Sequence, residues 1–252
     1  MRLDQYLVEK GFFKSRNKAK VAIDDNVIEV NGKIVSKASL DISDNDSVKI
    51  IGEVCPYVSR GGYKLEAAIK NFYLDFKDKV VVDIGSSTGG FTDCSLQNGA
   101  KLVYAIDVGS NQLDESLRIN PKVISMENTN IKDVNNFQMN PDFLVMDVSF
   151  VSITNLIEDI SRFITNDNAL VCLIKPQFEV GKMYLKNGIV KDKNLHIKVI
   201  ENLMKVLSTY GLYITKLIPS PILGGSGNRE YLALVKRDSF VNINVLEVVK
   251  GC

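Results

Sequence analysis

The chain has 252 residues, of which 45% are hydrophobic and 24% charged, with a formal net charge of +1. This length suffices for one full-sized core and a small additional domain, and the composition is that of an ordinary globular protein. No apolar run approaches the ~18 residues of a membrane span, and the first residues do not form a signal peptide, so a cytoplasmic protein is expected. Scattered cysteines and a single histidine give no zinc-binding pattern, so no metal is expected.

Charge is unevenly distributed at the N-terminal end. The first 22 residues carry six basic and two acidic side chains, whereas residues 23–53 carry three basic and seven acidic ones. A basic segment of this kind is a candidate surface for the phosphates of a nucleic acid. Its basic residues are Arg2, Lys10, Lys14, Arg16, Lys18 and Lys20.

Residues 1–54 predict a small α+β domain. Two short helices come first, and Ser15 is a good N-cap for the second of them. A hairpin follows, because Asn31-Gly32 separates two short apolar runs. A last strand is expected over residues 47–51. We place a linker at residues 55–58.

Residues 59–252 predict a second, α/β domain. Five short apolar runs alternate with helical stretches, which indicates a doubly wound parallel sheet with helices on both faces. A helix over residues 194–210 is followed by two strands without a helix between them, as in the antiparallel end of a seven-stranded Rossmann-like methyltransferase sheet. The five runs are Val80–Ile84, Leu102–Asp107, Lys122–Glu127, Phe143–Asp147 and Ala169–Ile174.

The strongest local motif is VVVDIGSSTGGFTD at residues 80–93, where a buried strand leads through a glycine-rich turn into a helix. Its spacing is not that of a dinucleotide site, and it has no lysine for a phosphate. The acid that ends the strand suits the cationic amino-acid end of S-adenosylmethionine, and Asp107 can accept hydrogen bonds from both ribose hydroxyls. Asn130 and Ile131 are predicted to lie beside the adenine only because of their position near the end of the third strand. The predicted cofactor-binding residues are Asp83, Gly85, Ser87, Gly89, Gly90, Phe91, Asp107, Val108, Asn130 and Ile131.

Four polar residues are predicted to meet beside this turn. Methyl transfer to a ribose hydroxyl is an in-line displacement, so the protein must align the hydroxyl and remove its proton. A neutral lysine amine, favoured by burial and a second nearby ammonium, can act as the base. We predict Lys175 as this base and Asp147 as its orienting partner, each at the end of a strand. Lys64 and Glu230 are predicted to be positioning residues.

The motifs resemble those of a known family. RLDQYL, SRNKAK and VIEVNGK are similar to the S4 RNA-binding domain. VSRGGYKL, DIGSSTGGFTD, MDVSF, LIKPQFEVGK and SPILGGSGNREY resemble the TlyA family, which joins an S4 domain to an FtsJ-like methyltransferase. The resemblance implies 2′-O-methylation of cytidine in ribosomal RNA, with Lys64, Asp147, Lys175 and Glu230 matching the family's Lys-Asp-Lys-Glu set. It also implies RNA contacts by the N-terminal basic residues, to which we add Arg60.

Two departures from the family pattern bear on specificity. Better-known members carry Arg-x-Trp-x between the domains, whereas this chain reads CPYV at residues 55–58 and contains no tryptophan. The chain also opens at MRLDQYL without a short basic extension, as in the shorter type that modifies only large-subunit RNA. From the missing extension we expect the 50S ribosomal subunit as the partner. A monomeric enzyme is also expected.

Two other functions remain open from the sequence, and a third, membrane activity, is not supported by it. Asp-Val-Ser-Phe at residues 147–150 is similar to the Asp-Pro-Pro-Tyr loop of amino-group methyltransferases, although it lacks the prolines. Methylation of an amino group on an RNA base is therefore one alternative. A non-catalytic ribosome-assembly factor would not need the intact glycine turn and the four polar residues. A membrane-active protein would need a strongly apolar helix face, which the basic N-terminal segment lacks. His196 is expected at the boundary of the core rather than in catalysis.

Overall fold

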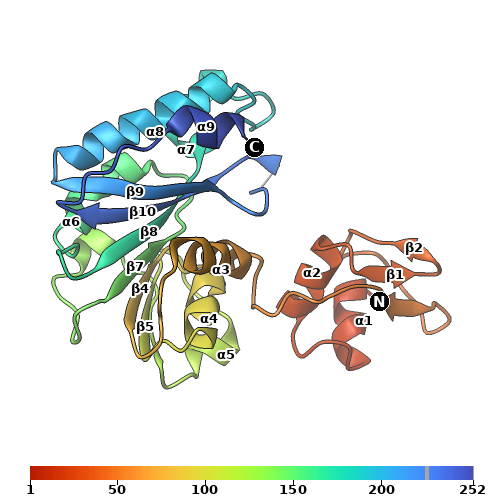
Figure 1. Ribbon diagram of the computed structural model, residues 1–252. Coiled ribbons are helices and arrows are strands. Elements are labelled where there is room, and N and C mark those ends of the chain that lie inside the picture. The colour runs from red at the N-terminus through yellow and green to blue at the C-terminus, as the bar shows by residue number, and fades with distance from the viewer. Residues whose placement is uncertain (225–226, 252) are drawn as a thin grey trace. The chain divides into compact units, whose positions relative to one another are not determined.

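The computed structural model describes residues 1–224 and 227–251. The chain forms two compact units, Met1–Gly62 and a larger unit that starts at Tyr63 (Figure 1). The division falls after Gly62, so the segment 55–58 belongs to the first unit. Within the described ranges, no helix is long and apolar enough to cross a membrane.

The first unit contains two helices and a three-stranded sheet, as the sequence predicts. Helix α2 begins after Ser15, whose hydroxyl accepts the Lys18 N–H at 3.3 Å. In the sheet, the central strand β1 pairs antiparallel with both neighbours, in the order β2-β1-β3. The elements are α1 (Leu3–Glu9), α2 (Arg16–Asp24), β1 (Ile28–Val30), β2 (Lys33–Ile34) and β3 (Val48–Ile50).

The core of this unit comes from one face of each helix. Ala19, Ala22 and Ile23 of α2 are fully buried with Leu3 and Leu7 of α1. Spacings of three and four residues place such side chains on one side of a helix, which leaves the basic residues of α2 on the other side. The apolar pattern therefore determines which face of α2 displays its positive charge.

The second unit is built on a seven-stranded sheet with the order β6-β5-β4-β7-β8-β10-β9. Strands β4 to β8 are parallel to one another, and β10 is antiparallel to both β8 and β9. The predicted methyltransferase-like sheet is confirmed. The strands are β4 (Val80–Ile84), β5 (Leu102–Ile106), β6 (Val123–Met126), β7 (Phe143–Met146), β8 (Ala169–Ile174), β9 (Leu212–Pro219) and β10 (Tyr231–Arg237).

Helices cover both faces of this sheet, with α3 and α4 on one face and α8 and α9 on the other (Figure 1). The α-helices are α3 (Gly61–Phe72), α4 (Gly90–Gln97), α5 (Glu115–Arg118), α6 (Ile157–Ser161), α7 (Pro176–Glu179), α8 (Lys193–Ser208) and α9 (Val245–Lys250). The 3₁₀ helices are η1 (Ile131–Asp133), η2 (Ile153–Asn155) and η3 (Lys182–Tyr184).

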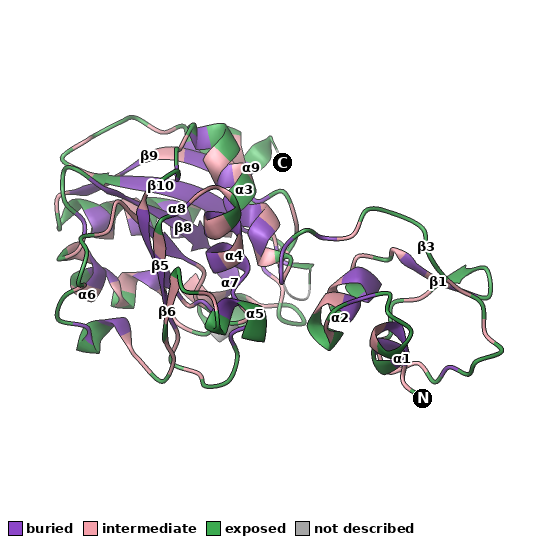
Figure 2. Ribbon diagram, turned by 90° about the horizontal axis from the view of Figure 1, so that it is seen from below, coloured by how far each residue is buried: buried purple, intermediate pink, exposed green. Residues whose placement is uncertain are grey.

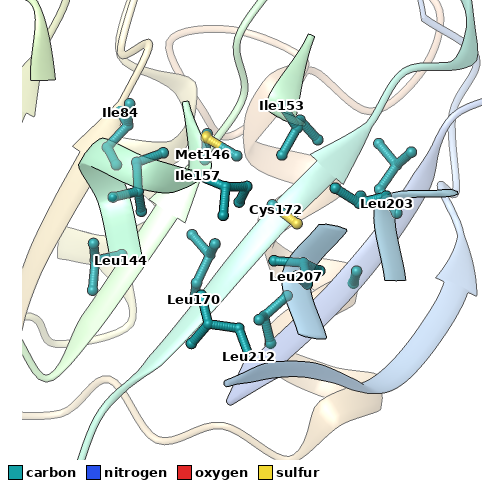
Figure 3. Packing of buried hydrophobic residues seen from close by; sticks show 14 of the residues in the cluster. Ile84, Leu144, Met146, Ile153, Ile157, Leu170, Cys172, Leu203, Leu207 and Leu212 are labelled. Carbon is teal, nitrogen blue, oxygen red and sulfur yellow. The ribbon is translucent and has the colours of Figure 1, made fainter. Parts of the chain in front are cut away.

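Because both faces are covered, the central strands are apolar almost throughout. Alternate residues of β8, such as Leu170 and Cys172, pack against α6 and α8 through Ile157, Leu203 and Leu207 (Figure 3). Figure 2 shows the result as buried strands between helices whose outer faces are exposed. This packing fixes the carboxyl ends of β4, β5, β7 and β8 along one edge of the sheet.

Candidate active site

A pocket of about 630 Å³ lies at the carboxyl ends of β4, β5 and β7. Open α/β sheets bind ligands at this edge, where the turns that follow neighbouring strands meet. Of the predicted cofactor-binding residues, Gly85, Ser87, Asp107, Val108, Asn130 and Ile131 line the pocket. Asp83, Gly89, Gly90 and Phe91 belong to the same turn and helix start but do not line it.

The turn after β4 depends on two glycines with positive φ, Gly85 (+82°) and Gly89 (+101°). A Cβ atom on Gly85 would lie 2.8 Å from the carbonyl oxygen of Asp147, and one on Gly89 would overlap the Leu117 side chain. Both the backbone angle and the lack of space therefore require glycine. The close approach of Gly85 to Asp147 brings the glycine turn and the polar cluster together.

The Asp107 carboxylate is oriented by backbone N–H groups on two sides. Its Oδ2 accepts the Ser87 N–H at 2.8 Å and its Oδ1 accepts the Gly109 N–H at 2.7 Å. A carboxylate oxygen has a second acceptor position, so both oxygens can each accept one further hydrogen bond. This arrangement fits the paired hydroxyls of a ribose.

The Asp83 carboxyl group lies beneath the turn and is fully buried. Its Oδ2 accepts the Thr92 hydroxyl at 2.6 Å, and its Oδ1 has no hydrogen-bond partner among the described residues. Burial raises the pKa of Asp83 to about 7, and the nearby carboxylates of Asp147 and Asp107 act in the same direction. A cationic group at the adjacent pocket would favour the ionised form of Asp83, so its position fits a ligand with a positively charged end.

The pocket loop that carries Asn130 and Ile131 is held by a residue that sequence reasoning missed. Arg162 donates hydrogen bonds from Nη2 to the carbonyl oxygens of Ile131 and Val134, at 3.2 and 2.7 Å. It thereby fixes the loop that carries Asn130 and Ile131. Arg162 lies far along the chain from that loop and in no motif, so the sequence offers no signal for it.

The four predicted catalytic residues form one continuous ionic cluster. Lys175 Nζ lies 2.5 Å from Asp147 Oδ1, and Lys64 Nζ lies 3.7 Å from Asp147 Oδ2. Lys64 Nζ also lies 2.8 Å from Glu230 Oε2. The side chains are between 2% and 19% exposed, so solvent screens these charges only weakly. The structure therefore brings all four together, and Asp147 also lines the pocket.

Two further side chains, Ser149 and Gln177, extend this cluster. Lys175 Nζ donates to the Ser149 hydroxyl at 2.7 Å, and Gln177 Nε2 donates to Glu230 Oε1 at 3.0 Å. Ser149 comes two residues after Asp147 in the motif MDVSF, and Gln177 comes two residues after Lys175 in the motif LIKPQFEVGK. Both residues therefore lie inside motifs that the sequence already indicates, but the atoms that they contact are known only from the folded chain.

The predicted RNA-binding residues of the first unit fall into two groups. Arg2 and Arg16 both donate to the fully buried carboxylate of Asp4, at 2.9 and 2.7 Å, while their own side chains remain 42% and 48% exposed. Lys10 pairs with Asp44 at 2.8 Å, and Arg60 lies 3.9 Å from Asp25. In the second group, no ion pair of Lys14, Lys18 or Lys20 is found within residues 1–224 and 227–251, so their charges are available to a polyanion.

We predict that Asp4→Asn destabilises the first unit by about 2 kcal/mol, because a neutral amide replaces the carboxylate that accepts charge-assisted hydrogen bonds from two arginines. The arginines hold the pKa of Asp4 down at about 2, below its ordinary value of 3.8. A lowered folded-state pKa adds stability above the ordinary value, and this stability is lost as the pH falls towards 2. Hydrogen exchange of α1 and α2 in the full chain measures the effect. The exposed Glu9→Gln is the matched control, and equal protection in both variants would contradict the prediction.

His196 lies in the core and outside the ionic cluster. Its Nδ1 is 2.8 Å from the Tyr231 hydroxyl and its Nε2 is 2.9 Å from the carbonyl oxygen of Val190. Burial lowers its pKa, which keeps the ring neutral at physiological pH. Its contacts join α8 to the loop before it and to β10, a structural role. Among the described residues, no group of acids, histidines and cysteines is arranged to hold a metal ion.

Comparison with known proteins agrees with this geometry. The chain is 42% identical to Hemolysin A of Brachyspira hyodysenteriae over 237 residues, covering 92% of this chain and 98% of that protein. It is 35% identical to the 23S rRNA (cytidine-2′-O)-methyltransferase TlyA of Campylobacter jejuni (92% and 97% covered) and 33% identical to the 16S/23S rRNA (cytidine-2′-O)-methyltransferase TlyA of Mycobacterium tuberculosis (91% and 87% covered). A solved Streptococcus thermophilus structure, described as a candidate hemolysin, superimposes with a TM-score of 0.79 at 40% identity, covering 100% of this chain and 94% of that one.

Family models also divide the chain into two parts, although the boundary between the models lies a few residues before Gly62. Residues 1–48 match the S4 domain, and residues 57–237 match the FtsJ-like methyltransferase. The second match covers the sheet, the glycine turn and all four residues of the ionic cluster. The chain therefore belongs to the FtsJ-like methyltransferase family and carries an S4 domain at its N-terminal end.

Proposed function

We propose that this protein is an S-adenosylmethionine-dependent 2′-O-methyltransferase that acts on cytidine in ribosomal RNA. The observation that carries the proposal is the position of Asp147. Its side chain lines the ligand pocket and at the same time pairs with both lysines of the cluster. A ligand in the pocket and a substrate hydroxyl at the ionic cluster would therefore both lie next to Asp147.

The residues of the pocket suit S-adenosylmethionine. Asp107 would accept hydrogen bonds from the ribose hydroxyls, while Asn130 and Ile131 would lie beside the adenine. Asp83, under the glycine turn, would favour a positively charged amino-acid end. When bound, the cofactor supplies a methyl group on a sulfonium, which needs no further activation.

The ionic cluster suits removal of a proton from the attacking hydroxyl. Lys175 Nζ donates a hydrogen bond to Ser149 Oγ at 2.7 Å and lies 2.5 Å from Asp147 Oδ1 as an ion pair. A neutral amine has one lone pair, so an amine held by these two side chains would offer that lone pair to the hydroxyl proton. Asp147 orients the amine, and Lys64 with Glu230 hold Asp147 from its other oxygen. A base held in this way fits general-base catalysis.

Ribosomal RNA as the substrate follows from the relatives and from the first unit. Two relatives are named for cytidine-2′-O-methylation, one in 23S and one in 16S and 23S RNA. The S4 domain and the free lysines of α2 support binding of phosphates. We favour the 50S subunit as the partner and a monomeric enzyme in the cytoplasm. We also favour an RNA-binding domain over residues 1–54 and a methyltransferase domain over residues 59–252, connected by residues 55–58.

The test incubates the purified chain with tritiated S-adenosylmethionine and with separated 30S and 50S subunits from cells that lack the enzyme. The RNA is then digested to nucleosides. We expect the label as 2′-O-methylcytidine from 50S subunits alone. Label in both subunits would remove the large-subunit preference and keep the activity. Label on a base would favour an amino-group methyltransferase, and no label in either subunit would favour a non-catalytic assembly factor.

A further inference from the structure

The short helix α7 (Pro176–Glu179) touches the active site with several consecutive side chains. Lys175 directly precedes it and binds Asp147 and Ser149. Gln177 binds Glu230, and the Phe178 ring lies 5.1 Å from the Phe150 ring. The role of the last residue of this helix, Glu179, does not follow from the proposed chemistry.

Glu179 binds the far end of the segment 147–153. Its Oε2 accepts the Ser152 hydroxyl at 2.5 Å, and its Oε1 accepts the Ile153 N–H at 2.8 Å. Ser152 is the N-cap of η2 and Ile153 is its first residue, so a carboxylate from a different element binds the start of this helix. Two hydrogen bonds to one carboxylate give a defined geometry, and the buried Ile153 side chain anchors the same point in the core.

The segment 147–153 forms a wall of the pocket. Asp147, Val148, Ser149, Phe150 and Val151 all line it. Phe150 has φ of +65°, a conformation that costs free energy in a residue with a side chain, so contacts on either side must hold it. The Asp147 N–H binds the Ile84 carbonyl oxygen at 3.1 Å on one side, and Glu179 supplies the contact on the other.

We propose that Glu179 is a positioning residue, which holds the segment 147–153 so that Asp147 meets Lys175 and the pocket wall forms. The catalytic part of this proposal rests on the proposed function, whereas the effect of Glu179 on the shape of the pocket does not depend on it. Glu179 touches neither the pocket nor the ionic cluster, and it acts through the backbone of the segment. Loss of this contact therefore affects cofactor binding and the base together.

The test measures binding of S-adenosylhomocysteine by titration calorimetry and methyl transfer at saturating cofactor, all in the full chain. Glu179→Ala removes both charge-assisted hydrogen bonds. Because they act on the pocket only through the backbone of the segment, this variant should weaken binding about tenfold and lower kcat about tenfold. Glu179→Gln should restore most of both, because the amide can accept from Ile153 and donate to Ser152. Ser152→Ala should have a smaller effect and should add little to Glu179→Ala, as expected for two partners in one contact.

The matched control is Glu158→Ala, an exposed glutamate on α6. Glu179→Ala values equal to those of this control, or a Glu179→Gln variant as impaired as the alanine variant, would overturn the proposal. If Glu179→Ala fails to fold, Ser152→Ala gives the answer, and control-like binding in that variant would overturn it. If the unchanged chain binds S-adenosylhomocysteine but methylates no ribosomal RNA, the proposed function fails, while the binding data still decide the role of Glu179.

Discussion

Replacing Lys175 by alanine should lower kcat by about 10³-fold and leave the affinity for S-adenosylhomocysteine close to that of the unchanged chain. A general base contributes roughly 10²–10⁴-fold to the rate of a proton-transfer step. Lys175 is the residue whose Nζ contacts both Asp147 and Ser149, and it does not line the pocket at the ends of β4, β5 and β7. The measurement combines calorimetry with single-turnover methyl transfer to 50S RNA.

Lys175→Arg separates the role of a base from that of a positive charge. A guanidinium keeps the charge near Asp147 but cannot deprotonate, so this variant should be as slow as the alanine variant. Lys186→Ala, an exposed lysine outside the cluster, is the control and should keep full activity. An arginine variant within tenfold of the unchanged rate would show that Lys175 acts through charge alone and would remove it as the base.

Replacing Asp107 by alanine should weaken binding of S-adenosylhomocysteine on the order of 100-fold. The carboxylate accepts the Ser87 and Gly109 N–H groups, and it would also accept the ribose hydroxyls. Hydrogen bonds to a charged group are worth about 1.5–3 kcal/mol each, so their combined loss accounts for this factor. Calorimetry on the purified variant measures the change. At saturating cofactor, kcat should change little, since the ionic cluster is not touched.

Glu115→Gln provides the control for Asp107→Ala, because Glu115 is an exposed acid on the neighbouring helix α5. Its effect on affinity should be small. An Asp107→Ala variant with unchanged affinity would mean that the ligand lies elsewhere in the pocket. The assignment of Asn130 and Ile131 to the adenine would then also be withdrawn, since both depend on the same placement of the ribose.

The sequence predicts those parts of the site that follow from the ends of parallel strands. Strand β8 appears as an uninterrupted apolar run, and β4 as a run interrupted only by Asp83, because helices cover both faces of the sheet. The structure gives both strands the predicted bounds. Asp107, Asp147 and Lys175 directly follow three such runs. Since parallel strands end at the same edge of a sheet, these three residues are expected to lie close together although they are distant along the chain.

Glu230 shows where the argument from strand ends needs the sheet topology. It precedes β10, and a residue before a parallel strand would lie at the opposite edge of the sheet. Strand β10 is antiparallel to β8, with Tyr231 opposite Ile174, so Glu230 lies beside the end of β8 and close to Lys175. The two final strands without a helix between them indicated this reversal in the sequence.

Contacts made by residues that lie in no periodic pattern could not be predicted. Arg162 holds a pocket loop through carbonyl oxygens, and every residue offers a carbonyl, so no pattern of residue types marks its partners. The pairs of Arg2 and Arg16 with Asp4 are of the same kind. Both arginines were assigned to RNA from their charge, and their shared structural partner becomes visible only when α1 and α2 pack together.

The division of the chain after Gly62 bears on kinetics through effective concentration. A first unit that holds RNA keeps the target nucleotide near the second unit, and a short covalent connection corresponds to local concentrations of about millimolar. Affinity for the ribosome and the rate of methyl transfer are then controlled by different parts of the chain. Weakening the first unit should raise KM for RNA with kcat unchanged, and the loss should be recovered at high RNA concentration. Two separate pieces mixed in solution would lack this benefit, because each would have to find the RNA independently.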